Sequence, residues 1–289
     1  MTHPDLSVVT VSSGRAQLLL RKLAALAAQH LDPRRLELVL VDNACPHDVG
    51  SQVEARRWPF GVQVLRAARR LPPGPARCLA LDAATAPLVW LSDDDCLPEP
   101  QAAERHLARQ WPEPCVVVGG LRFVDAGRQR PPQRTTPRVR PGPLFVTGAN
   151  TSLPREAMRR ACEAPLELPR PYGGEDLVLG LQLYDQGYRF LAAPEAVVEH
   201  HGPDPRWGGE PAKGYDAGYN AVAIARRWPA AAWGLGVHPL QIALKRLALA
   251  SPEASPWRRL APGRVRYERA YLDGCLAARR EFAKEEGSP

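Results

Sequence analysis

Several features that would place a chain in a common class are scarce or absent here. No apolar run reaches the roughly 18 residues that a membrane-spanning helix needs, so we expect no membrane span. The first ten residues, MTHPDLSVVT, have no basic region ahead of a long apolar one, and we therefore expect no signal peptide. Neither a zinc-finger spacing nor an RNA-binding aromatic motif is present, so we expect no nucleic-acid partner despite a net charge of +7.

Lysine is nearly missing from this basic chain. Only four of its 38 basic residues are lysine, and the rest are arginine. The arginine guanidinium group can bind a phosphate or carboxylate group through two hydrogen bonds at once, in a bidentate arrangement. Either an anionic ligand or a compositional bias of the whole sequence accounts for this preference.

Cysteine pairs with metal-site or redox spacing are also absent. The six cysteines lie at 45, 78, 96, 115, 162 and 275, and none forms a CxxC pair. A chain of 289 residues can bury a sizeable core without disulfides. We therefore expect reduced, mostly buried thiols in a cytoplasmic protein, and leave open a peripheral contact with the inner face of the membrane.

The first hundred residues alternate strand and helix patterns. Apolar, valine-rich runs predict strands at 6–11, 36–41, 62–65 and 88–91, with helical spacings at 18–30, 49–57 and 76–86 between them. Repeated strand–helix units imply a parallel sheet, whose ligands bind beyond the carboxyl ends of the strands. Three polar segments fall at such ends, namely Ser12–Arg15, Asp42-Asn43 and Asp93–Asp95.

The second half of the chain is less regular. It predicts strands at 115–124, 144–153, 190–192 and 196–198, and helices separated by proline-containing loops from 211 to 286. Another helix opens at Glu175 and stops at Gly187, a residue type that commonly ends helices. Residues 126–143 are predicted to form an arginine-rich loop. This loop is either a mobile lid over a site or a solvated insertion.

The three consecutive carboxylates at 93–95 are the sharpest chemical feature. Side by side they repel one another, and a divalent cation such as Mg²⁺ or Mn²⁺ relieves that repulsion while bridging to substrate phosphates. An exposed acidic turn is the alternative, but the position directly after a buried strand favours a metal site. Glu175-Asp176 at a helix start and His200-His201 after an apolar strand are further candidates, because metal and substrate ligands need only converge in space.

Four segments together resemble family-2 glycosyltransferases of the GT-A fold. They are SVVTVSSGR (7–15), LVLVDNAC (38–45), GPARCLALDAATAPLVWLSDDDCLPEP (74–100), and GANTSLPREAM (148–158) with GGEDLVLGLQLYDQGYRFLAAPEAVVEHHG (173–202). The resemblance implies a Rossmann-like, mostly parallel mixed sheet flanked by helices. It also implies a catalytic domain at 1–205, with a nucleotide-sugar-binding half at 1–100 and an acceptor-binding half at 101–205. A C-terminal helical extension at 206–289 follows.

The resemblance assigns the donor-binding residues one by one. Asp42 would bind the nucleotide base, and Ser12 lies on the nucleotide loop. Arg15 and Arg77 would assist at the nucleotide or diphosphate. Asp93 would contact the ribose, with Asp94 beside it on the donor. The metal, Mn²⁺ or Mg²⁺, would be held by Asp95, with His200 favoured over His201 as a further ligand.

On the acceptor side, the resemblance makes Asp176 the catalytic base and Glu175 its neighbour. A nucleotide-diphosphate sugar, with a UDP-sugar favoured, would then donate to a hydroxyl in one displacement that inverts the anomeric centre. The acceptor stays open among a glycan, a lipid-linked molecule and a small natural product, and the lack of a membrane span favours a soluble one. A homodimer also stays open. Three positions depart from the family pattern: the first loop reads Val11-Ser12-Ser13-Gly14, Cys78 replaces an asparagine, and Val178 replaces a second acid.

Two other functions remain alternatives on the sequence. A nucleotidyltransferase of similar architecture would also use a carboxylate-bound metal, but it favours a glycine-rich, lysine-containing phosphate loop that is not seen here. A non-catalytic basic binding protein would not need the acidic triplet, Asp176 and His200 to converge. For the apolar stretch 229–250, packing against the main domain is favoured over a dimer or membrane surface.

Overall fold

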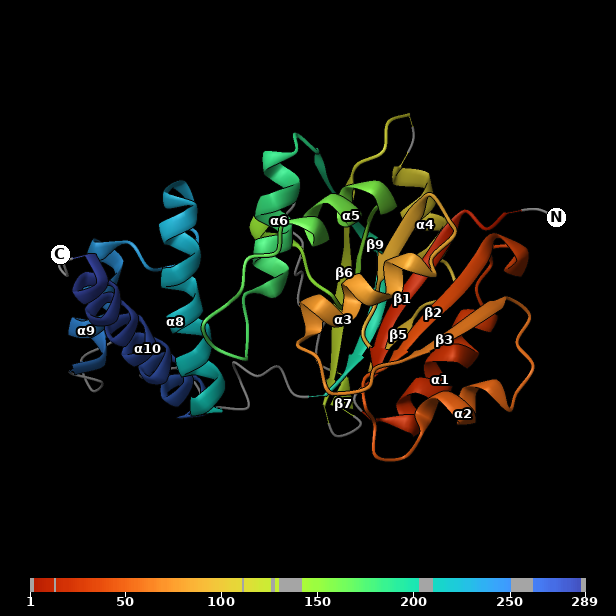
Figure 1. The fold of residues 1–289 in the computed structure, drawn as a ribbon, viewed down its shortest axis with the longest axis horizontal. Helices are drawn as coiled ribbons and strands as arrows, with labels where there is room; N and C mark the ends of the chain where they lie inside the picture. Colours follow the sequence, from red (N-terminus) through yellow and green to blue (C-terminus); the bar gives the residue numbers. More distant parts are fainter. Residues whose placement is uncertain are drawn as a thin grey trace. The chain divides into compact units, whose positions relative to one another are not determined.

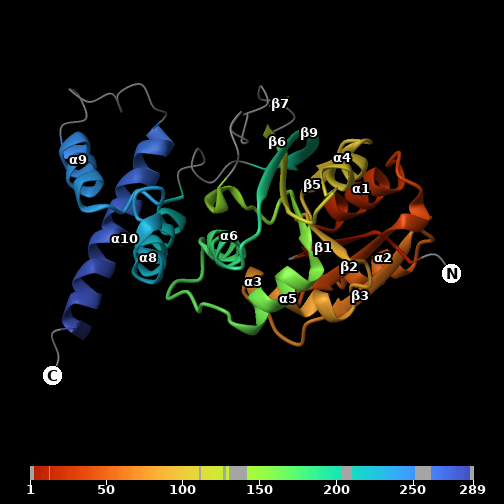
Figure 2. The same ribbon diagram turned by 90° about the horizontal axis from the view of Figure 1, so that it is seen from above.

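The computed structural model describes residues 3–12, 14–110, 112–125, 128–129, 142–202, 210–250 and 262–286. The chain divides into two compact units, which are shown in Figures 1 and 2. The first comprises residues 1–165 and 179–202, and the second comprises 166–178 and 203–289.

The first unit is built on a mixed sheet. Over the described residues the strand order is β3-β2-β1-β4-β8-β6-β9-β5, and β7 pairs with β6. The strands are β1 (Leu6–Ser12), β2 (Leu36–Asp42), β3 (Gly61–Arg66), β4 (Leu88–Leu91), β5 (Cys96–Pro98), β6 (Val116–Asp125), β7 (Arg128–Gln129), β8 (Thr151–Pro154) and β9 (Phe190–His201). Because β1 pairs in parallel with both β2 and β4, and β2 with β3, the predicted parallel half is confirmed.

Helices cover both faces of this sheet. They are α1 (Ala16–Ala27), α2 (Val49–Glu54), α3 (Pro73–Leu79), α4 (Ala102–Arg109), α5 (Arg155–Glu163) and α6 (Glu175–Asp185), of which α6 begins in the second unit. Short 3₁₀ turns lie at η1 (Pro33–Arg35), η2 (Ala80–Asp82) and η3 (Pro143–Phe145).

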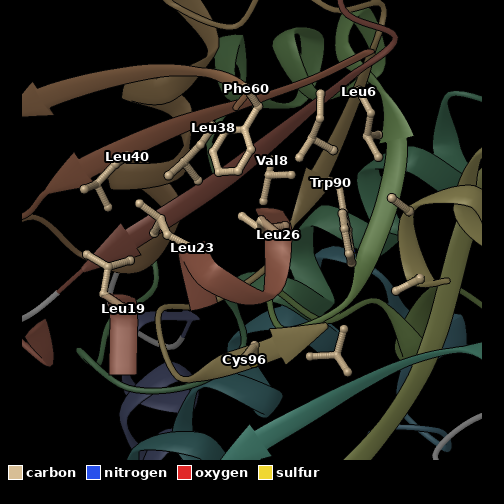
Figure 3. Close-up of a cluster of buried hydrophobic side chains, with 14 of the residues drawn as sticks. Leu6, Val8, Leu19, Leu23, Leu26, Leu38, Leu40, Phe60, Trp90 and Cys96 are labelled. Atoms are coloured by element: carbon tan, nitrogen blue, oxygen red, sulfur yellow. The ribbon is translucent and has the colours of Figure 1, made fainter. Parts of the chain in front are cut away.

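Alternating strand residues supply the two apolar layers. In β4, Leu88 and Trp90 pack into the layer that holds α1, α2 and α4, part of which is drawn in Figure 3. Val89 and Leu91 pack into the other layer, with α3 and α5. Since successive side chains of a strand point to opposite faces, a strand buried on both sides tends to carry apolar residues at successive positions. This explains the unbroken run LVWL.

Several predicted boundaries were wrong in the second half of this unit. The run 144–153 forms a strand only from Thr151, because Pro143–Phe145 is a 3₁₀ turn. The two short strands expected at 190–192 and 196–198 are one strand, β9. Its pairing with β6 shifts register between Gly119 and Gly120, where Pro194 lacks an N–H to donate. The register shift accounts for the break in the strand pattern.

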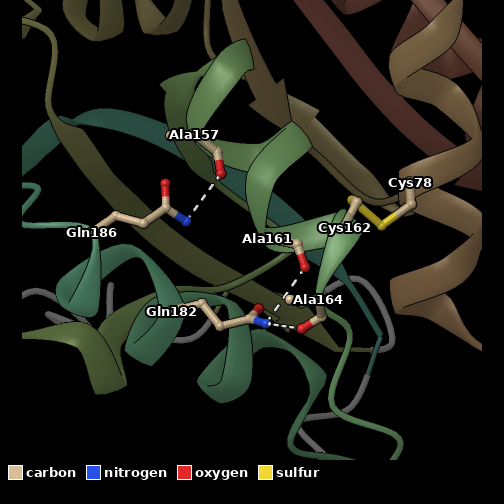
Figure 4. Close-up of a disulfide and its surroundings, with 7 residues drawn as sticks. All are labelled: Cys78, Ala157, Ala161, Cys162, Ala164, Gln182 and Gln186. Atoms are coloured by element: carbon tan, nitrogen blue, oxygen red, sulfur yellow. Dashed lines mark hydrogen bonds between the residues drawn. A yellow bond between two sulfur atoms is a disulfide. The ribbon is translucent and has the colours of Figure 1, made fainter.

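One disulfide corrects the prediction that all cysteines are reduced. Cys78 in α3 and Cys162 in α5 are joined, with Cα atoms 5.7 Å apart (Figure 4). Cys45, Cys96, Cys115 and Cys275 are free thiols. The two joined cysteines are 84 residues apart in sequence, so no local spacing pattern points to the pair.

The described residues from 211 onward in the second unit are mostly helical. They contain α8 (Pro211–Arg227), η4 (Pro229–Ala231), α9 (Pro239–Ala250) and α10 (Pro262–Glu286), as the sequence predicts. Glycines let α8 and α10 approach closely: a Cβ on Gly218 would lie 2.0 Å from the Tyr271 carbonyl oxygen, and one on Gly274 would lie 2.1 Å from that of Tyr215. No helix in the described ranges combines the length and apolar character needed to cross a membrane.

Candidate active site

The carboxyl ends of three neighbouring strands bring the predicted donor residues to one edge of the sheet. Ser12 ends β1 and lies opposite Asp42, which ends β2. Asp93 follows β4 after one residue, and β4 pairs with β1 on the other side. This common edge follows from parallel pairing, because the carboxyl ends of parallel strands point the same way.

Asp94 is the buried member of the acidic triplet. Its side chain is fully buried, and its Oδ2 accepts a hydrogen bond of 2.9 Å from Ser12 Oγ. The Arg15 guanidinium pairs with both Asp94 Oδ1 and Asp95 Oδ2. Burial raises the pKa of Asp94 above its ordinary value, although Arg15 opposes that shift. Arg15 therefore joins two carboxylates that would otherwise repel each other.

Asp93 is paired with a second arginine. Arg77 Nη2 donates a hydrogen bond of 3.0 Å to Asp93 Oδ1. Burial opposes ionisation of Asp93, but the charges of Arg77, Lys22 and His200 outweigh it and hold its pKa below the ordinary value. Gly148 leaves the room that Arg77 needs, because a Cβ there would lie 1.8 Å from the guanidinium nitrogen Nη2. Gly148 of the GAN segment therefore leaves space for Arg77, which is predicted to assist at the nucleotide or diphosphate.

Asp95, Cys96 and His200 form a candidate metal cluster. Each offers a ligand atom, and the three atoms lie within 4.8 Å of one another. His200 Nε2 is 3.8 Å from Asp95 Oδ1, and the buried His200 Nδ1 has no hydrogen-bond partner. Burial raises the pKa of Cys96 well above its ordinary value, so its thiol stays protonated. The oxygen of Asp95 and the nitrogen of His200 suit Mn²⁺ or Mg²⁺ better than a protonated thiol does.

The two neighbouring histidines lie in different surroundings. The His200 ring packs 5.1 Å from the Phe123 ring. His201 Nε2 instead lies 3.4 Å from Glu199 Oε2. The backbone N–H of His201 donates to the Asp95 carbonyl at 2.8 Å, which ties β9 to the acidic triplet. The structure brings His200 to the triplet by its side chain and His201 by its backbone.

Asp42 is already engaged by its own loop. The side chain is buried, and its two oxygens accept backbone N–H groups from Cys45 at 3.0 Å and Gly50 at 2.9 Å. These contacts fix the loop that follows β2. The role of Asp42 at the nucleotide base stays a prediction.

Lys22 is a buried charge that the sequence reasoning missed. It is fully buried in α1, and its Nζ donates to Ser92 O and Ser92 Oγ, each at 2.7 Å, and to Asp93 O at 2.9 Å. Burial lowers the pKa of Lys22 to about 8, although the neighbouring carboxylates oppose that shift. A lysine between Leu19, Leu23 and Leu26 on the apolar face of a helix was the available signal.

The predicted acceptor residues open a helix in the second unit. Glu175 and Asp176 are the first two residues of α6, where carboxylates complement the helix dipole. The preceding Gly173 and Gly174 have φ values of +79° and +109°, which favour glycine. Their role toward an acceptor stays a prediction. Most of the arginine-rich loop, at 126–127 and 130–141, lies outside the described residues.

The model of glycosyl transferase family 2 matches residues 7–164, more than half of the chain. The chain belongs to glycosyl transferase family 2. This family match confirms the resemblance deduced from the four segments. No curated protein sequence matches the chain.

Solved structures confirm the GT-A fold of this family 2 glycosyltransferase. The mannosyltransferase PcManGT from Pyrobaculum calidifontis, in complex with GDP-Man and Mn²⁺, is 20% identical, with a TM-score of 0.66 over 96% of this chain and 87% of that one. S. aureus TarS 1-349 in complex with UDP-GlcNAc is 17% identical, with a TM-score of 0.58 over 97% and 92%. GalNAc-T7 with UDP, GalNAc and Mn²⁺ is 18% identical, with a TM-score of 0.55 over 74% and 47%.

Proposed function

We propose that this glycosyltransferase is metal-dependent and inverting, and that it moves a sugar from a nucleotide-diphosphate sugar, preferably a UDP-sugar, to an acceptor hydroxyl. The observation that carries the proposal is the acidic triplet at the shared strand edge, with Arg15, Arg77 and His200 around it. Similar structures bound to nucleotide sugars and Mn²⁺ support the same ligand class.

On the donor side, Asp95 and His200 would hold Mn²⁺ or Mg²⁺. The bound ion would supply Lewis-acid stabilisation of the diphosphate leaving group. Asp93 would bind the ribose beside Asp94, and Asp42 would bind the base. Arg15 and Arg77 carry positive charge to the same edge of the sheet and would bind the diphosphate oxygens through two parallel hydrogen bonds.

On the acceptor side, Asp176 would take the proton from the attacking hydroxyl as general base, with Glu175 binding the acceptor beside it. One displacement then inverts the anomeric configuration. No covalent nucleophile takes part, so the free cysteines need no catalytic role.

Release of a free nucleoside diphosphate tests the proposal. Wild-type protein incubated with UDP-, GDP-, dTDP- and ADP-sugars should release UDP fastest, and a chelator should abolish the release. Pyrophosphate as the product would instead indicate a nucleotidyltransferase, and no turnover with any donor and acceptor would indicate a binding protein. Calorimetry with the four free nucleotides checks the base, and a clear preference for ADP would contradict the role of Asp42. The anomeric configuration of the product, determined by NMR, checks inversion.

We also propose that the enzyme is cytoplasmic and that it binds the inner face of a membrane through α9, a contact that would favour a lipid-linked acceptor. Leu240, Leu244 and Leu247 are 53%, 56% and 71% exposed, whereas Ile242 and Leu249 on the opposite side of the helix are buried. An exposed apolar helix face of this kind typically marks an interaction surface. Helix α9 carries two basic and no acidic side chains. Lys245 pairs with Glu268 at 2.7 Å, and Arg246 is exposed, where it would complement an anionic lipid surface.

Vesicle sedimentation tests the membrane contact. Wild-type protein should sediment with vesicles rich in phosphatidylserine more than with phosphatidylcholine vesicles, and Leu247→Glu should stay in the supernatant. Tyr184→Glu is the matched control, because Tyr184 is 61% exposed and lies on α6. The membrane proposal is wrong if the wild-type protein does not bind vesicles and instead forms a dimer that Leu247→Glu dissociates. That result would show that the face joins two copies of the chain.

A further inference from the structure

The segment before Glu175 is held by one buried side chain of α8. Asn220 is fully buried, and its Oδ1 accepts the backbone N–H of Arg170 at 3.0 Å. Its Nδ2 donates to the carbonyl oxygens of Arg170 at 3.0 Å, Tyr172 at 3.1 Å and Gly173 at 2.7 Å. A single amide group therefore binds the backbone at three of the six residues that precede Glu175-Asp176.

The glycine turn packs directly on the same helix. A Cβ on Gly174 would lie 3.0 Å from Ile224 Cδ1 and 3.5 Å from Asn220 Cβ, and one on Gly173 would lie 3.4 Å from Ala217 Cβ. With φ values of +79° and +109°, these residues adopt a backbone that other residue types rarely reach. Packing and conformation together fix the path of the chain as it enters α6.

A cation–π contact adds a second link to α8. The Arg170 guanidinium lies 4.3 Å from the centroid of the Tyr219 ring and 5.7 Å from that of Tyr215. Both rings are on α8, next to the close approach of Gly218 to α10. The segment is therefore held by a helix that is itself packed tightly against its neighbour.

The turn also sets the first turn of α6. The Gly174 carbonyl accepts the backbone N–H of Val178 at 2.9 Å, the hydrogen bond that encloses Glu175 and Asp176. A displaced Gly173-Gly174 turn would therefore reorient both carboxylates.

We propose that Asn220 is a positioning residue for Glu175 and Asp176, and that the C-terminal helices thereby take part in activating the acceptor. This inference rests on the proposed function, because it assumes that Asp176 is the general base. Displacement of a catalytic group by about 1 Å can lower turnover by about 10²-fold. Donor binding, which we assign to the first unit, should not respond.

The experiment measures kcat, acceptor KM and nucleotide affinity for Asn220→Leu. We expect kcat to fall by about 10–10²-fold, with UDP affinity within about twofold of wild type, because only the acceptor-side turn moves. Tyr271→Phe is the matched control: it removes a hydrogen bond of 2.6 Å from Tyr271 Oη to the Leu235 carbonyl, elsewhere in the second unit. The control should keep wild-type kcat. An equal loss of kcat in both variants would overturn the inference.

A second variant covers the case in which Asn220→Leu does not fold. Asn220→Asp keeps the volume and the acceptor for the Arg170 N–H, but it turns the donors toward Tyr172 and Gly173 into acceptors. We expect a similar loss of kcat from this variant. Wild-type kcat in the folded Asn220→Asp protein would overturn the inference.

A double variant separates this inference from the proposed function. If Asn220 acts through Asp176, Asn220→Leu should lower kcat by less than about threefold in the Asp176→Asn background, because coupled residues are not additive. Losses that multiply fully would overturn the inference while leaving Asp176 as the base. Wild-type kcat in Asp176→Asn alone would instead refute the base assignment.

Discussion

The two units hold their charged residues by different means. In the first, three carboxylates pair with Arg15 and Arg77, and the buried Lys22 donates to the backbone carbonyls of Ser92 and Asp93 beside them, so positive groups lie next to negative ones. In the second, the neutral amide side chain of Asn220 forms hydrogen bonds with backbone groups of the turn that precedes Glu175-Asp176. The difference follows from what each must restrain: adjacent carboxylates repel, whereas a glycine turn leaves carbonyl oxygens that need donors.

The comparison implies that the two regions respond to different perturbations. The donor edge of the first unit depends on ionised groups, so a change of charge or pH should disturb it. The turn of the second unit depends on neutral hydrogen bonds, so a change of shape should disturb it. Four predictions follow in order of decreasing effect: the first compares the two units, and the other three measure what holds the first unit together.

The largest effect is expected from Asp95→Ala. Loss of a ligand should abolish metal-stimulated turnover, by about 10³-fold or more, because a metal ion supplies several kcal/mol to the transition state. Binding of Mn²⁺ measured by electron paramagnetic resonance, together with UDP calorimetry, should show that both affinities fall. Asp176→Asn, which changes the other unit, should lower kcat by about 10²–10⁴-fold with UDP affinity unchanged. If both variants weakened UDP binding equally, the separation into donor and acceptor units would be wrong.

Removal of Lys22 should be the largest change in stability. Lys22→Ala removes the cation beneath the acidic triplet and leaves a cavity, so we expect the free energy of unfolding in urea to fall by about 3–5 kcal/mol. Arg21→Ala is the matched control, because Arg21 is exposed on the same helix; its effect should stay within about 0.5 kcal/mol. A small loss for Lys22→Ala would mean that the triplet does not need a buried cation.

The Cys78–Cys162 disulfide should stabilise the first unit by about 2–4 kcal/mol, because it restricts the unfolded chain. Thermal unfolding with and without a thiol reductant measures this difference. The double variant Cys78→Ser/Cys162→Ser should unfold at the temperature of the reduced wild type and show no response to reductant. A reductant response that persists in the double variant would exclude this disulfide as its cause.

His106 should make the first unit sensitive to acid. It is fully buried between Asn150 and Ser152, and burial lowers its pKa from 6.5 to about 4. Between pH 6.5 and about 4, His106 is protonated in the unfolded chain but not in the folded protein. The free energy of unfolding therefore falls as the pH drops through this range. His106 should lower the free energy of unfolding by about 3 kcal/mol at most. His106→Gln, which does not titrate, should remove that part of the pH dependence in urea titrations; an unchanged curve would contradict the assignment.

The first hundred residues and residues 101–205 differ in how much their sequences reveal. Strands β1, β2 and β4 are short runs in which apolar residues predominate, and their observed ends lie within one residue of the predicted ones. Strand β9 contains Pro194 and pairs across a register shift, so its pattern looks like two strands. Strand β5 has only three residues, too few to show a period, and it was missed, as were helices α4 and α5.

The sequence by itself determined the strand–helix alternation, the placement of Asp42 and Asp93–Asp95 at strand ends, and the family, because these depend on local periodicity and on ordered motifs. Only the tertiary structure decided that Cys78 joins Cys162, that Lys22 lies beneath the triplet, and that Asn220 holds the turn before Glu175. Each of these contacts joins residues about 50 or more positions apart, and such pairs leave no periodic trace in the chain. The contacts of Lys22 and Asn220 form because a buried polar group must find a hydrogen-bond partner wherever the fold supplies one.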